Sequence, residues 1–431
     1  MTLARSGSIL FVGTMAGNFS NYLFQFFMGK YLPVEDYGTM NAVFSMLVIV
    51  AIPSTTIMLV LARYVSIFMA ESDMGKISSL YRNSLKKIGL LGCAFFLPFL
   101  LFRTPIAGYL NITSTMPVVI IGAAVMLTFI VTVNFGILQG LQKFYYLGAG
   151  MGSTGVLKLL SGVILVFFGL GLNGAVASVV CSSLLVFAFT SVPLAGYYAA
   201  GDWAGPVQKH TRDIVSYSMP VLASTFAITV LTNVDLILVK HFFPALEAGL
   251  YASIAILGKT ILYLPAAFVL ALFPIVSGSK GVDDKTFRIL DRALLYTVGI
   301  SLAGVLLFTF FSEVIIKICF GDRYLHSAPL LKYYAFSMMS MAVMTVLVSF
   351  NLARSRTGFL YILAAGAVSI IGLLTFFHGS LLTIVLIIMS VNFLMALTHL
   401  WMTHRERSVF LRQRIGGERD GNEVGFYNYP G

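Results

Sequence analysis

Charged residues are scarce in this sequence, and that scarcity limits what the protein can be. Only 10% of the 431 residues are Asp, Glu, Lys or Arg, whereas 58% are hydrophobic. A soluble protein needs about 25% charged residues to cover its surface. No segment is long and polar enough to form a separate soluble domain. A protein solvated mainly by water is therefore excluded.

Cysteine and histidine are also rare, with three and six residues respectively. Cys93, Cys181 and Cys319 all lie within apolar runs, and the histidines form no pair at helical spacing. Disulfide frameworks and metal sites are recognised by closely spaced clusters of these residues. We therefore expect no disulfide framework, no metal site and no bound cofactor.

Long apolar runs are what the sequence does contain. Each has roughly 20 residues, enough for a helix to cross a hydrocarbon core of about 30 Å. The first run lacks a small-residue cleavage site, so we expect it to be retained as a span. The sequence predicts an all-α, polytopic membrane protein with about twelve transmembrane helices, at residues 9–30, 38–63, 87–107, 117–141, 149–171, 173–198, 213–240, 249–275, 292–319, 328–352, 358–378 and 380–402.

Lys and Arg are distributed unequally between the two sides of the predicted membrane. With a cytoplasmic N-terminus, 20 of the 28 fall in cytoplasmic segments, six fall outside, and two lie within spans. Such a bias marks the cytoplasmic side. Both termini are therefore predicted to be cytoplasmic. The net charge of +11 is expected to attract anionic inner-leaflet lipids rather than nucleic acid.

The two halves of the chain resemble each other at an offset of 211 residues. The matching segments are Tyr31 through Gly38 with Phe242 through Gly249, and Val65-Ser66 with Val276-Ser277. Chance similarity between apolar helices is the alternative explanation. The match predicts two six-helix lobes, at residues 1–205 and 206–403, related by an axis along the membrane normal. A basic tail at 404–431, expected to be disordered, follows them.

A polar stripe runs along the first predicted span. Thr14, Asn18, Asn21 and Gln25 are spaced four, three and four residues apart, which places them on one face of a helix. Lipid cannot satisfy amide side chains, so this face must contact protein or line a water-filled cavity. We favour a cavity that binds substrate; hydrogen bonds that merely join helices are the alternative.

Lys158 lies near the middle of the fifth predicted span. Gly148, Gly155, Gly162 and Gly169 repeat there every seven residues and indicate a close-packing helix face. Lys158 shares that face, so we expect its side chain to point into the protein. Snorkelling to the cytoplasmic interface, the alternative, must cover roughly 14 Å. An embedded lysine of this kind is a candidate contact for an anionic substrate.

Asp235 and Lys259 are the other two ionisable residues placed deep within spans. Their predicted depths differ by roughly 6 Å, so the two side chains can reach each other. A structural ion pair and a functional site are both open interpretations. In the functional one, Lys259 attracts an anion while Asp235 orients that lysine or exchanges a proton. Arg63, at the cytoplasmic end of the second span, is a candidate contact for an incoming anionic headgroup.

Three segments carry a family pattern: Tyr31-Leu-Pro-Val-Glu-Asp-Tyr-Gly38; Asn233-Val-Asp-Leu-Ile-Leu-Val239 followed by Ala248-Gly-Leu-Tyr251; and Phe350-Asn-Leu-Ala-Arg-Ser-Arg356. Together they resemble the polysaccharide-transporter, or O-antigen flippase, branch of the multidrug/oligosaccharidyl-lipid/polysaccharide exporter superfamily. The resemblance implies two six-helix lobes forming a V around a central cavity. In that family, cationic residues facing the cavity hold the substrate's diphosphate. Lys158 and Lys259 suit this role by position and not by a motif.

The resemblance also implies a function and a location. It implies a flippase that moves an undecaprenyl-diphosphate-linked oligosaccharide, as in lipopolysaccharide synthesis, across the bacterial cytoplasmic (inner) membrane. Its partners are then this glycan lipid, anionic membrane lipids and other polysaccharide-assembly membrane proteins. No catalytic residue is expected, and coupling to H⁺ or Na⁺ through Asp235 is a further hypothesis. Lipid II flippases carry extra C-terminal spans that this chain lacks, which disfavours peptidoglycan precursor as cargo.

Two alternatives stay open at this point. The first is a cation-coupled multidrug antiporter of the same superfamily, which two embedded lysines against one aspartate disfavour. The second is a membrane-bound polysaccharide polymerase or ligase acting on the same lipid. The short outer loops, which offer only Asp322, Arg323 and His326 as candidate groups, disfavour an enzyme.

Overall fold

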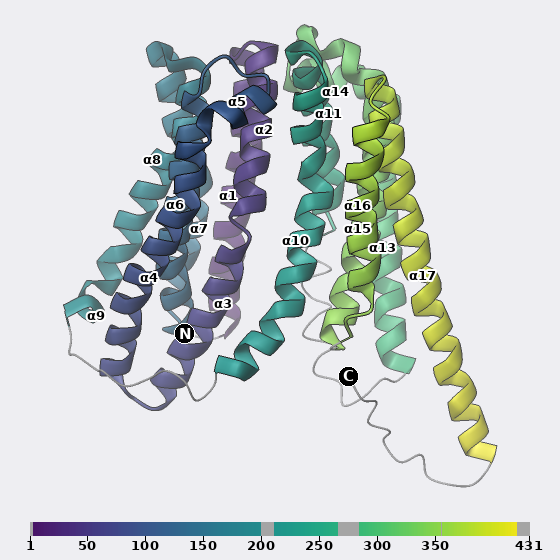
Figure 1. Cartoon of the computed structure of the whole chain (residues 1–431). Coiled ribbons are helices and arrows are strands. Elements are labelled where there is room, and N and C mark those ends of the chain that lie inside the picture. The colour runs from purple at the N-terminus through teal and green to yellow at the C-terminus, as the bar shows by residue number, and fades with distance from the viewer. Residues whose placement is uncertain (1–2, 200–210, 266–283, 355, 420–431) are drawn as a thin grey trace. The chain divides into compact units, whose positions relative to one another are not determined.

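The computed structural model describes residues 3–199, 211–265, 284–354 and 356–419. All regular elements within these ranges are helices, which confirms the predicted all-α membrane class (Figure 1). Contacts group the chain into unit 1, Met1–Ser253 with Ile316–His326, and unit 2, Ile254–Ile315 with Ser327–Gly431. The predicted lobe boundary between residues 205 and 206 lies outside the described residues.

Ten helices in the described part of the chain are long and apolar enough to cross a membrane. One of them, Phe144–Tyr198, covers both the fifth and the sixth predicted spans. The first predicted span, 9–30, lies within the helix Leu3–Tyr31, which is not among the ten because its amide side chains lower its hydropathy. The polytopic class is therefore confirmed, while the number twelve stays a prediction.

Unit 1 is a bundle in which α1 packs on α7, α3 and α4 pack on α6, and α8 packs on both α6 and α7. Its elements are α1 (Leu3–Tyr31), α2 (Val34–Val50), α3 (Pro53–Ala70), α4 (Met74–Leu101), α5 (Arg103–Tyr109), α6 (Met116–Gly140), α7 (Phe144–Leu165), η1 (Val166–Leu170), α8 (Gly171–Ser191), η2 (Val192–Leu194), α9 (Ala195–Ala199), α10 (Thr211–Phe242) and the start of α11 (Ala245–Tyr263).

Two of the long apolar segments are broken where the sequence has proline or glycine. α2 ends at Val50 and α3 begins at Pro53, because proline lacks the amide donor that a helix interior needs. Beyond α7, Gly169 and Gly171 adopt φ values of +84° and +47°. Glycine takes this conformation at little steric cost. The chain can therefore turn here from the fifth predicted span into the sixth.

Residues 64–86, which lie between the second and third predicted spans, are mostly helical. α3 and α4 leave only residues 71–73 between them. Asp73 caps α4 by accepting a hydrogen bond from the Lys76 amide at 3.0 Å, which holds the pKa of the Asp73 carboxyl below its usual value. The apolar pattern missed this part of α4 because its first turns carry charged residues.

Unit 2 is built around α15, on which α13 and α17 pack, and α16 packs on α17. Its elements are the remainder of α11, α13 (Asp284–Phe310), the start of α14 (Ser312–Cys319), α15 (Ala328–Ala353), α16 (Phe359–Phe376) and α17 (Leu381–Arg419). The end of α14 and most of η4 (Asp322–Ser327) belong to unit 1.

α17 extends well past residue 402, the predicted end of the last span. The tail predicted to be disordered from residue 404 is instead helical up to Arg419. Glu406 Oε2 pairs with Nη1 of Arg354 at 3.3 Å and with Nη1 of Arg356 at 2.5 Å. These ion pairs hold the start of this extension of α17 against the C-terminal end of α15. The composition of the tail alone does not predict them.

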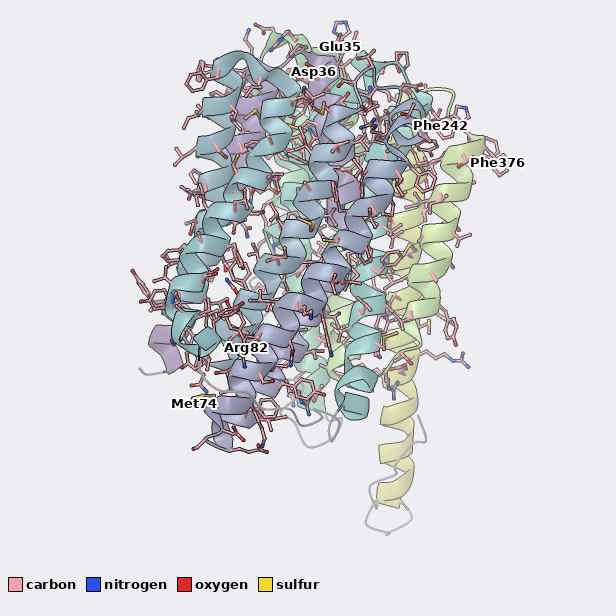
Figure 2. The ribbon with its side chains drawn as sticks, turned by 60° about the vertical axis from the view of Figure 1, so that its left-hand side comes forward. Glu35, Asp36, Met74, Arg82, Phe242 and Phe376 are labelled. Atoms are coloured by element: carbon pink, nitrogen blue, oxygen red, sulfur yellow. The ribbon has the colours of Figure 1, made fainter. Side chains whose placement is uncertain are left out.

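The two ends of unit 1 are named by residues that lie at them. Glu35 and Asp36 lie at one end, and Met74 and Arg82 lie at the opposite end (Figure 2). We call these the Glu35 end and the Arg82 end. In the predicted orientation, the Glu35 end is extracytoplasmic and the Arg82 end is cytoplasmic.

At the Glu35 end, the two matching loops of the sequence repeat touch each other. A Cβ on Gly38 would lie 2.6 Å from the amide nitrogen of Gly249, and a Cβ on Gly249 would overlap the carbonyl of Val34. Phe320, from the segment that joins unit 1, packs against Gly29 in the same region. The repeat-equivalent glycines thus allow α2 and α11 to cross closely. The other matching pair, Val276-Ser277, lies outside the described residues.

Candidate functional site

α1 and α7 pack backbone to backbone along a stripe of glycines. A Cβ on Gly152 would lie 2.8 Å from the carbonyl oxygen of Gly13, and a Cβ on Gly155 would overlap the carbonyl of Gly17. Any larger residue at these positions would push the two helices apart. The close-packing face predicted from the glycine repeat is therefore confirmed.

Gly169, the last glycine of that repeat, is not part of this face. It lies in η1 with a positive φ, and nothing stands within 4 Å of a Cβ built on it. A seven-residue spacing cannot distinguish a glycine that packs from one that ends a helix. The predicted role of Gly169 in packing is therefore wrong.

Lys158 lies on the face of α7 that is turned toward α1 and α2. Its Nζ is 4.6 Å from the ring centroid of Phe24 on α1 and 5.7 Å from that of Phe44 on α2. Cation–π attraction to a desolvated ammonium is worth about 2 kcal/mol. Within the described ranges, no carboxylate pairs with Lys158. The structure thus places a cation over two aromatic rings, without an acidic partner, at membrane depth.

The polar stripe of α1 adjoins this cation. Asn21 lies one turn before Phe24 and Gln25 directly follows it; both are half-buried, whereas Thr14 and Asn18 are exposed. Gln25 Oε1 is buried and has no hydrogen-bond partner among the described residues. A buried acceptor without a donor costs about 1–3 kcal/mol. A hydroxyl group of a ligand, or water, would satisfy it.

Asp235, on α10, has a partner that sequence reasoning missed. The Tyr251 hydroxyl on α11 donates a hydrogen bond to Asp235 Oδ2 at 2.7 Å, and Asp235 is only 1% exposed. Both residues belong to the segments that carry the family resemblance. That shared membership was the feature of the sequence from which their contact could have been predicted. Lys259 is also buried, in the part of α11 that belongs to unit 2. Its predicted ion pair with Asp235 stays a prediction.

Lys240, one of the six cations that the predicted topology places on the extracytoplasmic side, is a further buried cation. It is 2% exposed and interacts electrostatically with Asp36 and Glu35. These three residues lie where α10 packs against α2. The sequence did not indicate that Lys240 is buried, because it stands at the predicted end of its span, where an exposed cation is common. Arg63, by contrast, is exposed and lies inside α3, seven residues before that helix ends at Ala70, and its contact with a headgroup stays a prediction.

This chain is a polytopic membrane protein, because it has ten described helices long enough to span a membrane. It also carries polar groups within its helices, namely Lys158 and the amide stripe of α1. Residues 3–280, more than half of the chain, match the family described as polysaccharide biosynthesis proteins. The chain therefore belongs to that family.

One curated protein is similar to this chain in sequence, and several solved structures are similar to it in fold. The chain is 26% identical over 349 residues to the uncharacterized membrane protein MJ1068 of Methanocaldococcus jannaschii, covering 74% of this chain and 67% of the relative. It superposes on the inward-facing form of a multidrug resistance MATE family transporter of the MOP superfamily, with TM-score 0.74, 14% identity and coverage of 95% and 96%. It also superposes on lipid II flippase MurJ, with TM-score 0.68, 16% identity and coverage of 93% and 87%. The fold is thus one that membrane transporters use.

Proposed function

We propose that this protein is a flippase. It moves an undecaprenyl-diphosphate-linked oligosaccharide across the cytoplasmic membrane during cell-surface polysaccharide synthesis, by alternating access of two lobes. Both termini are cytoplasmic in this proposal. Lys158 and Lys259 attract the diphosphate, and Asn18, Asn21 and Gln25 contact the sugar.

Lys158 is the observation that carries the proposal. A cation at membrane depth is costly unless something compensates it. Two aromatic rings attract the ammonium of Lys158, but no acid neutralises it within the described residues. An anionic cargo supplies the missing charge, whereas a cationic drug would be repelled. The diphosphate of a glycan lipid is such an anion.

The neighbouring stripe on α1 suits the rest of the cargo. A sugar headgroup needs hydrogen-bond partners along its whole path, because lipid offers none. The amides of Asn18, Asn21 and Gln25 supply donors and acceptors there, and Gln25 Oε1 lacks a donor within the described chain. The polyprenyl tail needs no such path because it can stay in the bilayer.

Transport in liposomes tests the proposal directly. The purified full chain is reconstituted with a fluorescent undecaprenyl-diphosphate glycan, and an impermeant quencher measures how fast inner-leaflet label reaches the outer leaflet. We expect movement that protein-free liposomes do not show. Absence of movement with every glycan tested, together with ion-driven export of a cationic dye, would replace the flippase by the multidrug antiporter.

Asp235 provides a prediction about ion coupling. We expect Asp235→Asn to abolish any acceleration of flipping by an H⁺ or Na⁺ gradient, because the amide still accepts the Tyr251 hydrogen bond but carries no charge. Flipping rates with and without each gradient give the measurement. Tyr251→Phe is the matched control, since it removes the hydrogen bond and keeps the carboxylate. A gradient response that survives in Asp235→Asn would leave Asp235 with a structural role alone.

A further inference from the structure

A small apolar cavity opens in unit 1 between α3, α4 and α10. We call it the inner apolar pocket; its volume is about 350 Å³, and its lining includes Ile57, Val60, Leu61, Ile88, Leu91 and Leu222. Apart from the hydroxyl of Thr56, the side chains that line it are hydrocarbon. Pro53 begins α3 beside the pocket, and Pro220 lies inside α10 two residues before Leu222. Two of the three walls, α3 and α10, thus contain a proline, a residue that interrupts or bends a helix.

Basic side chains lie one helical turn away, on the Arg82 side of this pocket. Arg63 follows Val60 by three residues on α3, and Lys87 precedes Leu91 by four residues on α4. Each cation therefore shares a helix face with a lining residue, about 4.5–6 Å further along the axis. Both cations are exposed. They mark the mouth of the pocket.

The acids nearby do not neutralise these cations. The carboxylates of Glu71 and Asp73 both pair with Lys76, at 2.8 and 3.1 Å. In the part of the chain that the structure describes, Arg63 and Lys87 pair with no carboxylate. The mouth thus carries net positive charge beside a hydrocarbon cavity.

An amphiphile with an anionic head and a hydrocarbon tail complements both parts. The partly open pocket suits water poorly, because its lining offers an ordered water only one hydroxyl as a hydrogen-bond partner. A soluble anion would leave the cavity empty. A cationic drug would be repelled by the charges at the mouth.

We propose that the inner apolar pocket, with Arg63 and Lys87 at its mouth, is where the lipid carrier of the substrate first docks from the cytoplasmic leaflet. The isoprenoid units next to the diphosphate fill the pocket, and the diphosphate contacts the two cations. This proposal rests on the proposed function and adds to it a binding site that precedes Lys158.

The position of the pocket connects it to Lys158. Phe44, which contacts Lys158, and Ile57, which lines the pocket, belong to the same candidate span, Val34–Ala70. Arg63 lies on α3 and Phe44 on α2, and the break between these helices at residues 51–52 separates them. In the proposal, a diphosphate that docks at Arg63 moves past this break along α2 to reach Lys158.

Photolabelling of the full chain in lipid nanodiscs tests the docking site without relying on transport. The probe is undecaprenyl diphosphate with a diazirine on its first isoprenoid unit, and mass spectrometry locates the label. We expect label on the lining segments of α3 and α4, displaced by unlabelled undecaprenyl diphosphate. Ile57→Trp, which fills the pocket, should lower labelling at least tenfold. Leu90→Trp, at a neighbouring position that is 63% exposed, should not.

The charges at the mouth are tested by the same probe. Arg63→Gln and Lys87→Gln should each weaken binding about fivefold, and the pair about 25-fold. Lys317→Gln is the control; this exposed lysine lies on α14, away from the pocket, and its replacement should not change binding. If a thermal melting curve shows that the Ile57→Trp variant does not fold, Val60→Phe takes its place, because its smaller side chain fills less of the pocket.

Several results would overturn the docking site. Equal displacement by phosphatidylglycerol would make it an ordinary anionic-lipid contact, and equal loss in Ile57→Trp and Leu90→Trp would make it nonspecific. If a folded Ile57→Trp variant that is no longer labelled still flips the glycan at the wild-type rate, that result would reject the docking role of the pocket but not the flippase function. Specific labelling of a chain that flips no glycan would instead support the pocket and reject the flippase.

Discussion

Lys158→Ala is expected to slow the flipping of a diphosphate-linked glycan about thirtyfold in reconstituted liposomes. The ammonium of Lys158 stands over Phe24 and Phe44 with no carboxylate paired to it in the described chain. A hydrogen bond between charged groups is worth about 2 kcal/mol, or a factor of about thirty. The quencher assay measures the rate, and a melting curve shows that the variant is folded.

Two control variants sharpen this result. Lys158→Arg keeps the charge and is expected to retain most of the rate. Lys317→Ala removes an exposed lysine whose Nζ pairs with Asp322 at 2.9 Å, and it should flip like wild type. Equal rates in wild type and Lys158→Ala would remove Lys158 from the substrate site and leave the flippase to other residues.

Gly155→Leu is expected to lower the stability of the folded protein by about 3 kcal/mol, because the new side chain overpacks a tight interface. Even a Cβ at this position overlaps the carbonyl of Gly17, and backbone atoms cannot move aside as a flexible side chain can. α1 would be pushed away from α7, and Phe24 with it. The thermal midpoint in detergent measures the loss of stability.

Gly89→Leu is the matched control for that experiment. Gly89 lies inside α4 in the same unit, and nothing stands within 4 Å of a Cβ built on it. A leucine there meets open space, so the midpoint should stay close to that of wild type. Equal midpoints in the two leucine variants would contradict the tight α1–α7 contact.

The sequence predicts those parts of the protein that depend on local pattern. Apolar length identifies most spans, because the hydrocarbon core fixes how many residues a helix needs. The glycine spacing on α7 predicts both the contact with α1 and the inward direction of Lys158, because a helix brings residues seven apart to one face. Proline at position 53 marks the break between α2 and α3.

Other features depend on residues that are far apart in the chain, and no local pattern reveals them. The rings of Phe24 and Phe44 come to Lys158 from two other helices. Tyr251, on α11, reaches Asp235 on α10 from 16 residues further along the chain. The basic start of α4 was missed for a different reason: a helix that leaves the membrane loses the apolar pattern while keeping its hydrogen bonds.

The touching glycines at the Glu35 end have a consequence for how such a chain can arise. Gly38 and Gly249 are equivalent positions of the repeat, so their contact is of the kind that identical subunits make across a two-fold axis. A half-length ancestor with this loop could make it with a second copy of itself. Once the two copies are joined in one chain, equivalent positions in the two halves can acquire different residues. Lys240 illustrates that freedom, because its equivalent in the first repeat is Gly29, which lies under Phe320. The cation that faces Glu35 and Asp36 therefore occurs once, where a symmetric dimer would carry it twice.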